Sequence, residues 1–307
     1  MLFKIENSSS NIHLITLLIV IAGSITISVF VILVARNDPG LGPFVSTWTS
    51  NTAAVAAVTM ATIATLTAFR LQKTMRNSNN KNSNSEKYDQ IKRDTIRQHL
   101  YGLQSLTIGL ILWLIAEFTW TYYQLVVGIA NPFPSAADIF WLAGYPFFLY
   151  FVLNMNKAVA KNGIYDREAL LLISASAGLA LTYTFVLMFG TQELIPSTQD
   201  RLAWIISLLY PILDTIVLVP SLVLIGLLRK RKEQSAIASA WLIMAGSIVL
   251  VTIADIAFSY IQRIGESVEV EWFTDILYAS SYIFMTGALY WYHRVLTISQ
   301  GSKFNDV

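Results

Sequence analysis

The sequence contains no cysteine and only three histidines. Without cysteine, the chain has no disulfide framework, no zinc–thiolate site and no thiol nucleophile. His13, His99 and His293 all lie at the edges of apolar segments, which argues against a histidine-rich metal site inside a membrane. No lysine lies within an apolar segment, which excludes a retinal Schiff base. Motifs for a serine nucleophile, a metalloprotease or nucleotide binding are also absent, so we expect a non-enzymatic protein without a cofactor.

Charged residues are scarce as well, at 13% of the 307 residues, whereas hydrophobic residues make up 55%. A soluble domain is much less apolar than this, and a membrane-spanning helix needs about 20 mostly apolar residues. The sequence predicts an all-α fold, a polytopic integral membrane helical bundle in the lipid bilayer with about eight transmembrane helices. The predicted spans are residues 12–35, 47–69, 100–127, 137–156, 168–189, 202–228, 235–262 and 270–293. Asp138, Gly144 and Pro146 interrupt the fourth run, for which a re-entrant segment is the alternative.

The basic residues are distributed unevenly between the two sides of this predicted bundle. Of the 21 lysines and arginines, only Arg36, Arg201 and Arg263 fall in loops on one side. The positive-inside rule places the basic-rich side in the cytoplasm. We therefore expect a multi-pass protein of the cell membrane with both termini in the cytoplasm. The basic run at 229–232 is interpreted as a topology determinant, with lipid headgroup binding as the alternative, and we expect no nucleic-acid partner.

An asparagine- and serine-rich tract at residues 77–86 contains no apolar side chain and cannot bury a core. It predicts a division of the chain into four parts. These are a two-helix membrane leader at 1–69, a cytoplasmic linker at 70–99, a six-helix membrane core at 100–295 and a cytoplasmic tail at 296–307.

Two hairpins of the predicted core, at about 100–156 and 235–293, repeat the same pattern of polar residues. Glu117 and Asp255 each follow an alanine, and glutamine follows each acid seven residues later. The other equivalent pairs are Gln124 with Gln262, Asp138 with Asp275, Trp141 with Tyr278, and Tyr145 with Tyr282. Both hairpins start from the cytoplasmic side, so the repeat is parallel. Many secondary transporters have inverted repeats instead.

Carboxyl groups inside apolar helices are energetically costly and usually face a protein interior or a wet cavity. Residues three, four and seven positions apart share one face of a helix, so Glu117 shares a face with Trp113, and Asp255 shares one with Thr252, Ser259 and Gln262. No basic residue lies inside a span to neutralise the acids, which favours a proton-holding network or a site for an external cation. The candidate ligand or proton-site residues are Glu117, Asp138, Asp214, Asp255, Asp275, Gln124, Gln262, Trp113, Tyr145 and Tyr282.

Each acid also has a purely structural interpretation. Asp138 and Asp275 follow loops and sit where a helix-capping or first-turn acid would sit. Asp214 could bond backbone groups that the nearby Pro211 leaves free. Glu117 and Asp255 lie too deep for capping, and hydrogen bonding between helices is the alternative to a ligand role.

Three segments, 132–153, 208–214 and 253–260, carry Pro-Ser-x-x-Asp and Tyr-Pro motifs. They resemble an uncharacterised polytopic membrane module that precedes some prokaryotic histidine kinases and diguanylate cyclases. The residues that match the module's motif are Asp138, Tyr145, Pro146, Tyr210, Pro211, Asp214 and Asp255. This chain carries no cytoplasmic output domain and adds two N-terminal spans, so the resemblance implies signalling through a separate cytoplasmic partner.

These features favour a non-enzymatic membrane sensor or regulatory subunit with an acidic and aromatic cavity in the outer half of the membrane. The alternative is a small transporter, coupled to cations or protons, that uses the same acids. An acid-catalysed lipid enzyme would lack a nucleophile or metal in this sequence. A scaffold, in which the acids only join helices, is the remaining interpretation.

Overall fold

The computed structural model describes residues 7–38, 40–78, 86–159, 177–178, 201–229, 235–264 and 268–301. The described part of the chain is helical almost throughout and contains no strand, which confirms the predicted all-α class. Its elements are α1 (Asn7–Ala35), α2 (Leu41–Ser78), α3 (Glu86–Tyr122), a π-helical turn η2 (Tyr123–Val127), α4 (Ala136–Val159), α6 (Arg201–Arg229), α7 (Ser235–Ile264) and α8 (Val268–Gly301).

Six of these helices, α1, α2, α3, α4, α6 and α7, are long and apolar enough to cross a membrane. This confirms a polytopic membrane architecture. In α4 the candidate span runs from Ala136 to Asn156 and passes through Pro146 as one helix, which fits a crossing by length and composition. The predicted fifth span, 168–189, lies outside the described residues apart from positions 177–178.

The predicted eighth span falls within α8 but is not among the six apolar candidates. Its tyrosine, serine and tryptophan side chains lower its hydropathy. The reason such a helix is tolerated lies in its position, because α8 packs against α7, α2 and α1. Trp291 and Tyr292 are each 2% exposed, so the polar atoms of α8 face other helices instead of lipid.

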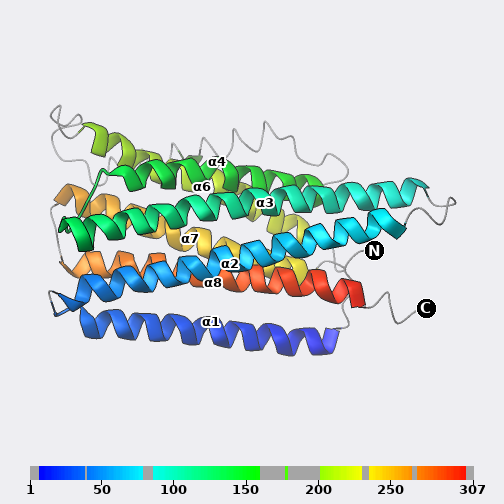
Figure 1. Cartoon of the computed structure of the whole chain (residues 1–307), viewed down its shortest axis with the longest axis horizontal. Helices are drawn as coiled ribbons and strands as arrows, with labels where there is room; N and C mark the ends of the chain where they lie inside the picture. The colour runs from blue at the N-terminus through cyan, green and yellow to red at the C-terminus, as the bar shows by residue number, and fades with distance from the viewer. Residues whose placement is uncertain are drawn as a thin grey trace.

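The helices run side by side along the long axis of the molecule (Figure 1). The start of α1 and the end of α8 lie at one end of the bundle, and the α1–α2 connection lies at the other. Figure 1 also shows α1 at one edge of the bundle. It contacts α8 through Leu17 and Ile21, and Ile21 fits against Gly287, where a side chain would collide with it. Most other apolar residues of α1 are exposed, as expected for a helix that faces lipid.

Helix α2 belongs to the centre of the bundle and packs against both α3 and α8. A stripe of small residues makes this close packing possible: Ala54, Ala57, Ala61, Ala64 and Ala68 are all buried. Small side chains let helix backbones approach closely in a membrane. The asparagine- and serine-rich tract separates α2 from the predicted core along the sequence. In the fold, however, α2 packs against that core.

Helices α3 and α4 form an antiparallel hairpin in which Trp113 donates a hydrogen bond from its indole to the Trp141 carbonyl at 3.0 Å. Gly144 makes room for this ring, since an added Cβ would lie 2.6 Å from Trp113. Helices α4 and α6 run parallel to each other. Residues early in α4 contact residues early in α6, and Asn156, late in α4, bonds the Pro220 carbonyl late in α6 at 3.2 Å.

Candidate ligand site

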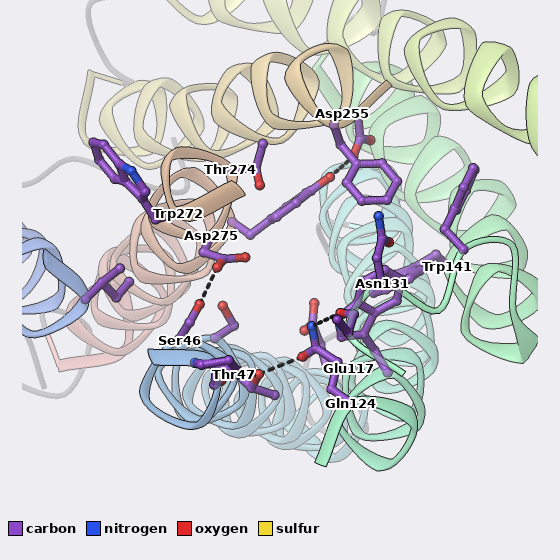
Figure 2. Close-up of a pocket in the computed structure, with 18 of the residues that line it drawn as sticks. Ser46, Thr47, Glu117, Gln124, Asn131, Trp141, Asp255, Trp272, Thr274 and Asp275 are labelled. Atoms are coloured by element: carbon purple, nitrogen blue, oxygen red, sulfur yellow. Dashed lines mark hydrogen bonds between the residues drawn. The ribbon is translucent and has the colours of Figure 1, made fainter. Parts of the chain in front are cut away.

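A cavity of about 440 Å³ opens at the end of the bundle that contains the α1–α2 connection. Its volume falls within the range of about 300–1,000 Å³ that is typical of small-molecule sites. Side chains from α2, α3, α4, α6, α7 and α8 line it, together with the loops before α2 and α4. Figure 2 shows Glu117, Asp255 and Asp275 approaching this space from three different sides.

Glu117 on α3 is held by an aromatic residue from each of two other helices. The Tyr282 hydroxyl of α8 donates a hydrogen bond to its Oε1 at 2.8 Å. The indole of Trp141 on α4 approaches the same carboxyl group. The hydrogen bond from Tyr282 leaves room on this carboxyl group, because a carboxylate can accept about four hydrogen bonds.

Asp255 on α7 is held in a similar way. The Tyr278 hydroxyl donates to Oδ1 at 2.5 Å, and the Tyr145 hydroxyl lies 3.4 Å from Oδ2. Asp255 is 6% exposed, and the cavity is the space that it faces.

The predicted equivalence of Asp138 and Asp275 does not extend to their structural roles. Asp138, 2% exposed, accepts from the Ser135 amide at 2.6 Å and from the Tyr210 hydroxyl at 2.7 Å. Asp138 therefore satisfies the start of α4 in the way expected of a first-turn acid. Asp275 lies well inside α8, which begins at Val268. Its capping interpretation is wrong, and its Oδ2 accepts from Ser46 of α2 at 2.5 Å.

Asp214 lies beneath the cavity and is 2% exposed. The expectation that it bonds backbone groups freed by Pro211 is not met. Its Oδ1 accepts from the Tyr145 hydroxyl at 2.7 Å, and the same hydroxyl lies 3.4 Å from Oδ2 of Asp255. Oδ2 of Asp214 has no hydrogen-bond partner within the described part of the chain.

The polar faces predicted for α3 and α7 differ in how many of their residues line the cavity. On α3, Trp113, Glu117, Trp120 and Gln124 all line the cavity. On α7, the residues that line it are Val251, Asp255 and Phe258. Thr252 instead bonds within its own helix, and Ser259 donates to the Ser207 carbonyl of α6 at 3.1 Å. The side chain of Gln262 lies outside those that the structure describes.

Gln124 reaches the cavity because the end of α3 changes its winding. The chain turns from α-helix to π-helix over Tyr123–Val127, and Gly128 ends the helix with a φ of 79°. Such a φ suits glycine, which has no Cβ to clash. The Gln124 amide then donates to the Ala130 carbonyl at 2.9 Å and accepts from Thr47 of α2 at 2.8 Å.

Aromatic rings close the inner side of the cavity. The ring of Trp113 lies 4.7 Å from that of Phe148 and 5.7 Å from that of Tyr145, between ring centres. Tyr282 completes this floor, with its ring centre 6.3 Å from that of Trp113. Below the floor lies a small void of about 40 Å³ with almost entirely apolar walls. The cavity is therefore open at one end of the bundle and closed toward its middle.

Several lining residues escaped the sequence analysis. Ser46, Thr47 and Ser50 come from α2, which the linker seemed to separate from the core. Their spacing of one and three to four residues places them on one face of α2. That polar face, within an otherwise apolar helix, is the signal that would have identified them.

The mouth of the cavity carries one residue of each charge. The Arg36 guanidinium lies 5.1 Å above the centre of the Trp272 ring. Asp38 accepts from the backbone amides of Gly40 and Leu41, both at 2.9 Å. These hydrogen bonds, first from Leu41 and then from Gly40, lower the pKa of Asp38 below its ordinary value.

Glu117 and Asp255 form no ion pair among the described residues. The ion pair found in that part of the chain joins Arg97 to Asp94, at an exposed position outside the cavity. No group of three or more histidine or acidic side chains in the described ranges is close enough to hold a metal ion. Separate carboxyl groups with aromatic neighbours suit an organic cation, which aromatic rings attract through their faces.

No family model, curated protein or solved structure matches this chain.

Proposed function

We propose that this protein is a non-enzymatic membrane sensor or regulatory subunit that binds a small organic cation in the acidic and aromatic cavity. The observation that carries the proposal is the cavity itself. Within the described part of the chain, Glu117 and Asp255 form no ion pair, and aromatic rings surround them. A positively charged ligand would supply the missing countercharge.

The proposed topology has eight crossings, with the cavity open to the outside. The parallel course of α4 and α6 supports the even number, because two parallel neighbours need a return path between them. The scarcity of basic residues on the side where the cavity opens supports the orientation. A ligand would then enter from outside the cell.

The closed floor favours a sensor over a channel or carrier. Beneath Trp113, Tyr145 and Tyr282 the buried side chains are mostly apolar, and Asp214 is the acid among them. One buried acid does not make a continuous polar path for a charged ligand, so binding of the ligand would act on the helices around it.

Helix α8 offers a route for that action. It carries Asp275 and Tyr278 at the cavity and continues to the opposite end of the bundle. There His293 hydrogen-bonds with Thr67 of α2 at 3.1 Å, and His99 of α3 hydrogen-bonds with Tyr292. A shift of α8 would change these contacts. They lie at the end of the bundle where a separate cytoplasmic partner would bind. The resemblance to membrane modules of signalling proteins agrees with this role.

The test is the thermal stability of the purified protein in detergent with butylammonium, tetramethylammonium or potassium. Binding raises stability with the logarithm of the ratio of ligand concentration to Kd, once that ratio exceeds one. We expect stabilisation by an organic cation, and its loss in the Glu117→Gln/Asp255→Asn double variant. The Asp94→Asn variant, which changes an exposed acid, is the matched control. Failure of every cation to stabilise the wild type would contradict the proposal and favour acids that only join helices.

A proton-coupled transporter is the second candidate, and one observation favours it. Tyr145 bridges Asp255 in the cavity wall and Asp214 below the floor, which is the arrangement that a proton relay needs. Uptake of labelled butylammonium into reconstituted vesicles, abolished by Asp255→Asn, would favour transport. Binding without uptake, accompanied by altered hydrogen exchange at the His293 end of α8, would favour sensing.

A further inference from the structure

The cavity contains two half-sites built on the same plan. In the first half-site, Glu117 receives a hydrogen bond from Tyr282 of the other hairpin, and the indole of Trp141 of its own hairpin approaches the same carboxyl group. The two aromatic donors approach from α4 and α8. Each of these side chains lines the cavity.

In the second half-site the roles of the hairpins are exchanged. Asp255 receives a hydrogen bond from Tyr278 of its own hairpin, and the Tyr145 hydroxyl of the other hairpin lies 3.4 Å from it. The donors approach from α8 and α4. All six residues of the two half-sites occupy equivalent positions of the sequence repeat, so each hairpin completes the acid site of its counterpart.

The two half-sites lie on different walls of one cavity. Figure 2 shows Asp255 and Glu117 well separated across the opening. No three acidic or histidine side chains of the described residues lie close enough together to hold one metal ion. A single small cation placed at one acid would therefore leave the other acid without a countercharge.

We propose that the cavity binds a linear aliphatic diamine, with one ammonium group at Glu117 and the other at Asp255. This inference rests on the proposed function, because it names the ligand class of the same cavity. Each ammonium group brings three donors. Each carboxylate accepts one close hydrogen bond from a tyrosine and retains lone pairs to receive the ammonium donors.

The walls between the half-sites suit the methylene chain of such a ligand. Trp113, Trp120 and Phe258 line the cavity with aromatic surface. These rings exclude water from the chain and attract the flanking ammonium groups by cation–π interaction. Asp138 also lines the cavity, and it ties the start of α4 to α6 by accepting from the Ser135 amide and the Tyr210 hydroxyl.

The test measures the Kd of the full chain in detergent by calorimetry for 1,3-diaminopropane, 1,4-diaminobutane, 1,5-diaminopentane and butylamine. We expect one diamine to bind at least about tenfold more tightly than butylamine, because its second ammonium group binds intramolecularly. Affinity should pass through an optimum with chain length. Glu117→Gln and Asp255→Asn should each reduce the affinity for that diamine to the level of butylamine. Asp94→Asn should leave it unchanged.

The outcomes separate this inference from the proposed function. Equal affinities for butylamine and all the diamines would overturn the diamine inference while leaving a cation site in place. Absence of binding by every amine would overturn both. If a variant does not fold, the wild type still decides, since a flat dependence on chain length contradicts two spaced half-sites.

Discussion

The Tyr145 hydroxyl donates a hydrogen bond to Oδ1 of Asp214, 2.7 Å away. The same hydroxyl lies 3.4 Å from Asp255. Tyr145 therefore connects an acid of the cavity wall with an acid beneath the cavity floor. Both acids are deeply buried, at 6% and 2% exposure, so the loss of a donor cannot be compensated by bulk water.

Replacing Tyr145 with phenylalanine should destabilise the protein by about 1–3 kcal/mol, because buried polar groups lose their hydrogen-bond partner. Unfolding in detergent, followed by tryptophan fluorescence, measures the effect. Tyr150→Phe is the matched control, since Tyr150 lies on the same helix and is 48% exposed. Equal stability of the two variants would mean that the Tyr145 hydroxyl contributes little.

Asp214→Asn should retain stability to within about 0.5 kcal/mol of the wild type, the range of changes that disrupt no special interaction. The asparagine oxygen still accepts from Tyr145, and its amide group supplies a neutral donor in place of Oδ2. Asp214→Leu should cost about 1–3 kcal/mol, because it leaves the Tyr145 hydroxyl unsatisfied. Chemical unfolding of the two variants side by side is the measurement. Equal damage by the two substitutions would show that a neutral hydrogen-bonding side chain cannot replace the Asp214 carboxyl group.

Asp38 should give a pH dependence of stability on the acid side. Its carboxylate is stabilised by two amide hydrogen bonds, so its pKa is lower in the folded than in the unfolded protein. This contribution is fully present above the ordinary pKa of 3.8 and disappears as pH falls through the folded value. The difference in unfolding midpoint between wild type and Asp38→Asn should therefore shrink below that pH. A constant difference at all pH values would show that the carboxylate charge is not responsible.

Gly144→Ala should destabilise the floor of the cavity by about 1–3 kcal/mol, the usual cost of overpacking. The added methyl group meets the Trp113 ring at 2.6 Å, and this ring cannot move without disturbing Phe148. Gly23→Ala is the control, because nothing lies within 4 Å of its added Cβ. Alanine should stabilise that helix position by about 0.5–1 kcal/mol. The comparison uses thermal unfolding, and a stable Gly144→Ala variant would show that the floor is loosely packed.

Hydropathy identifies the apolar helices well, because a run of apolar residues is a local property of the chain. It is weaker for α8, whose tyrosines and serines are compatible with a membrane only because other helices cover them. Hydropathy also does not predict which distant segments pack against each other. The contact of Ser46 with Asp275 joins α2 to the far end of the chain, across the linker that suggested a separate leader.

The sequence repeat predicts which acids are equivalent but not which of them share a role. Asp138 and Asp275 occupy matching positions, yet α4 begins two residues before Asp138 and α8 begins seven before Asp275. One acid therefore caps a helix, and the other lies in the wall of the cavity. The difference arises where the helices start, which the repeated residues do not determine.

The sequence by itself determined the helical class, the apolar spans, the uneven basic charge and the acids that need an explanation. Each of these follows from the composition of a short segment and the cost of placing it in lipid. The tertiary structure decided which acids meet which donors. Tyr282 with Glu117 and Tyr145 with Asp255 are pairs separated by 165 and 110 residues. Such pairs form only when helix packing brings two hairpins together, because no local spacing in the chain encodes the distance between them.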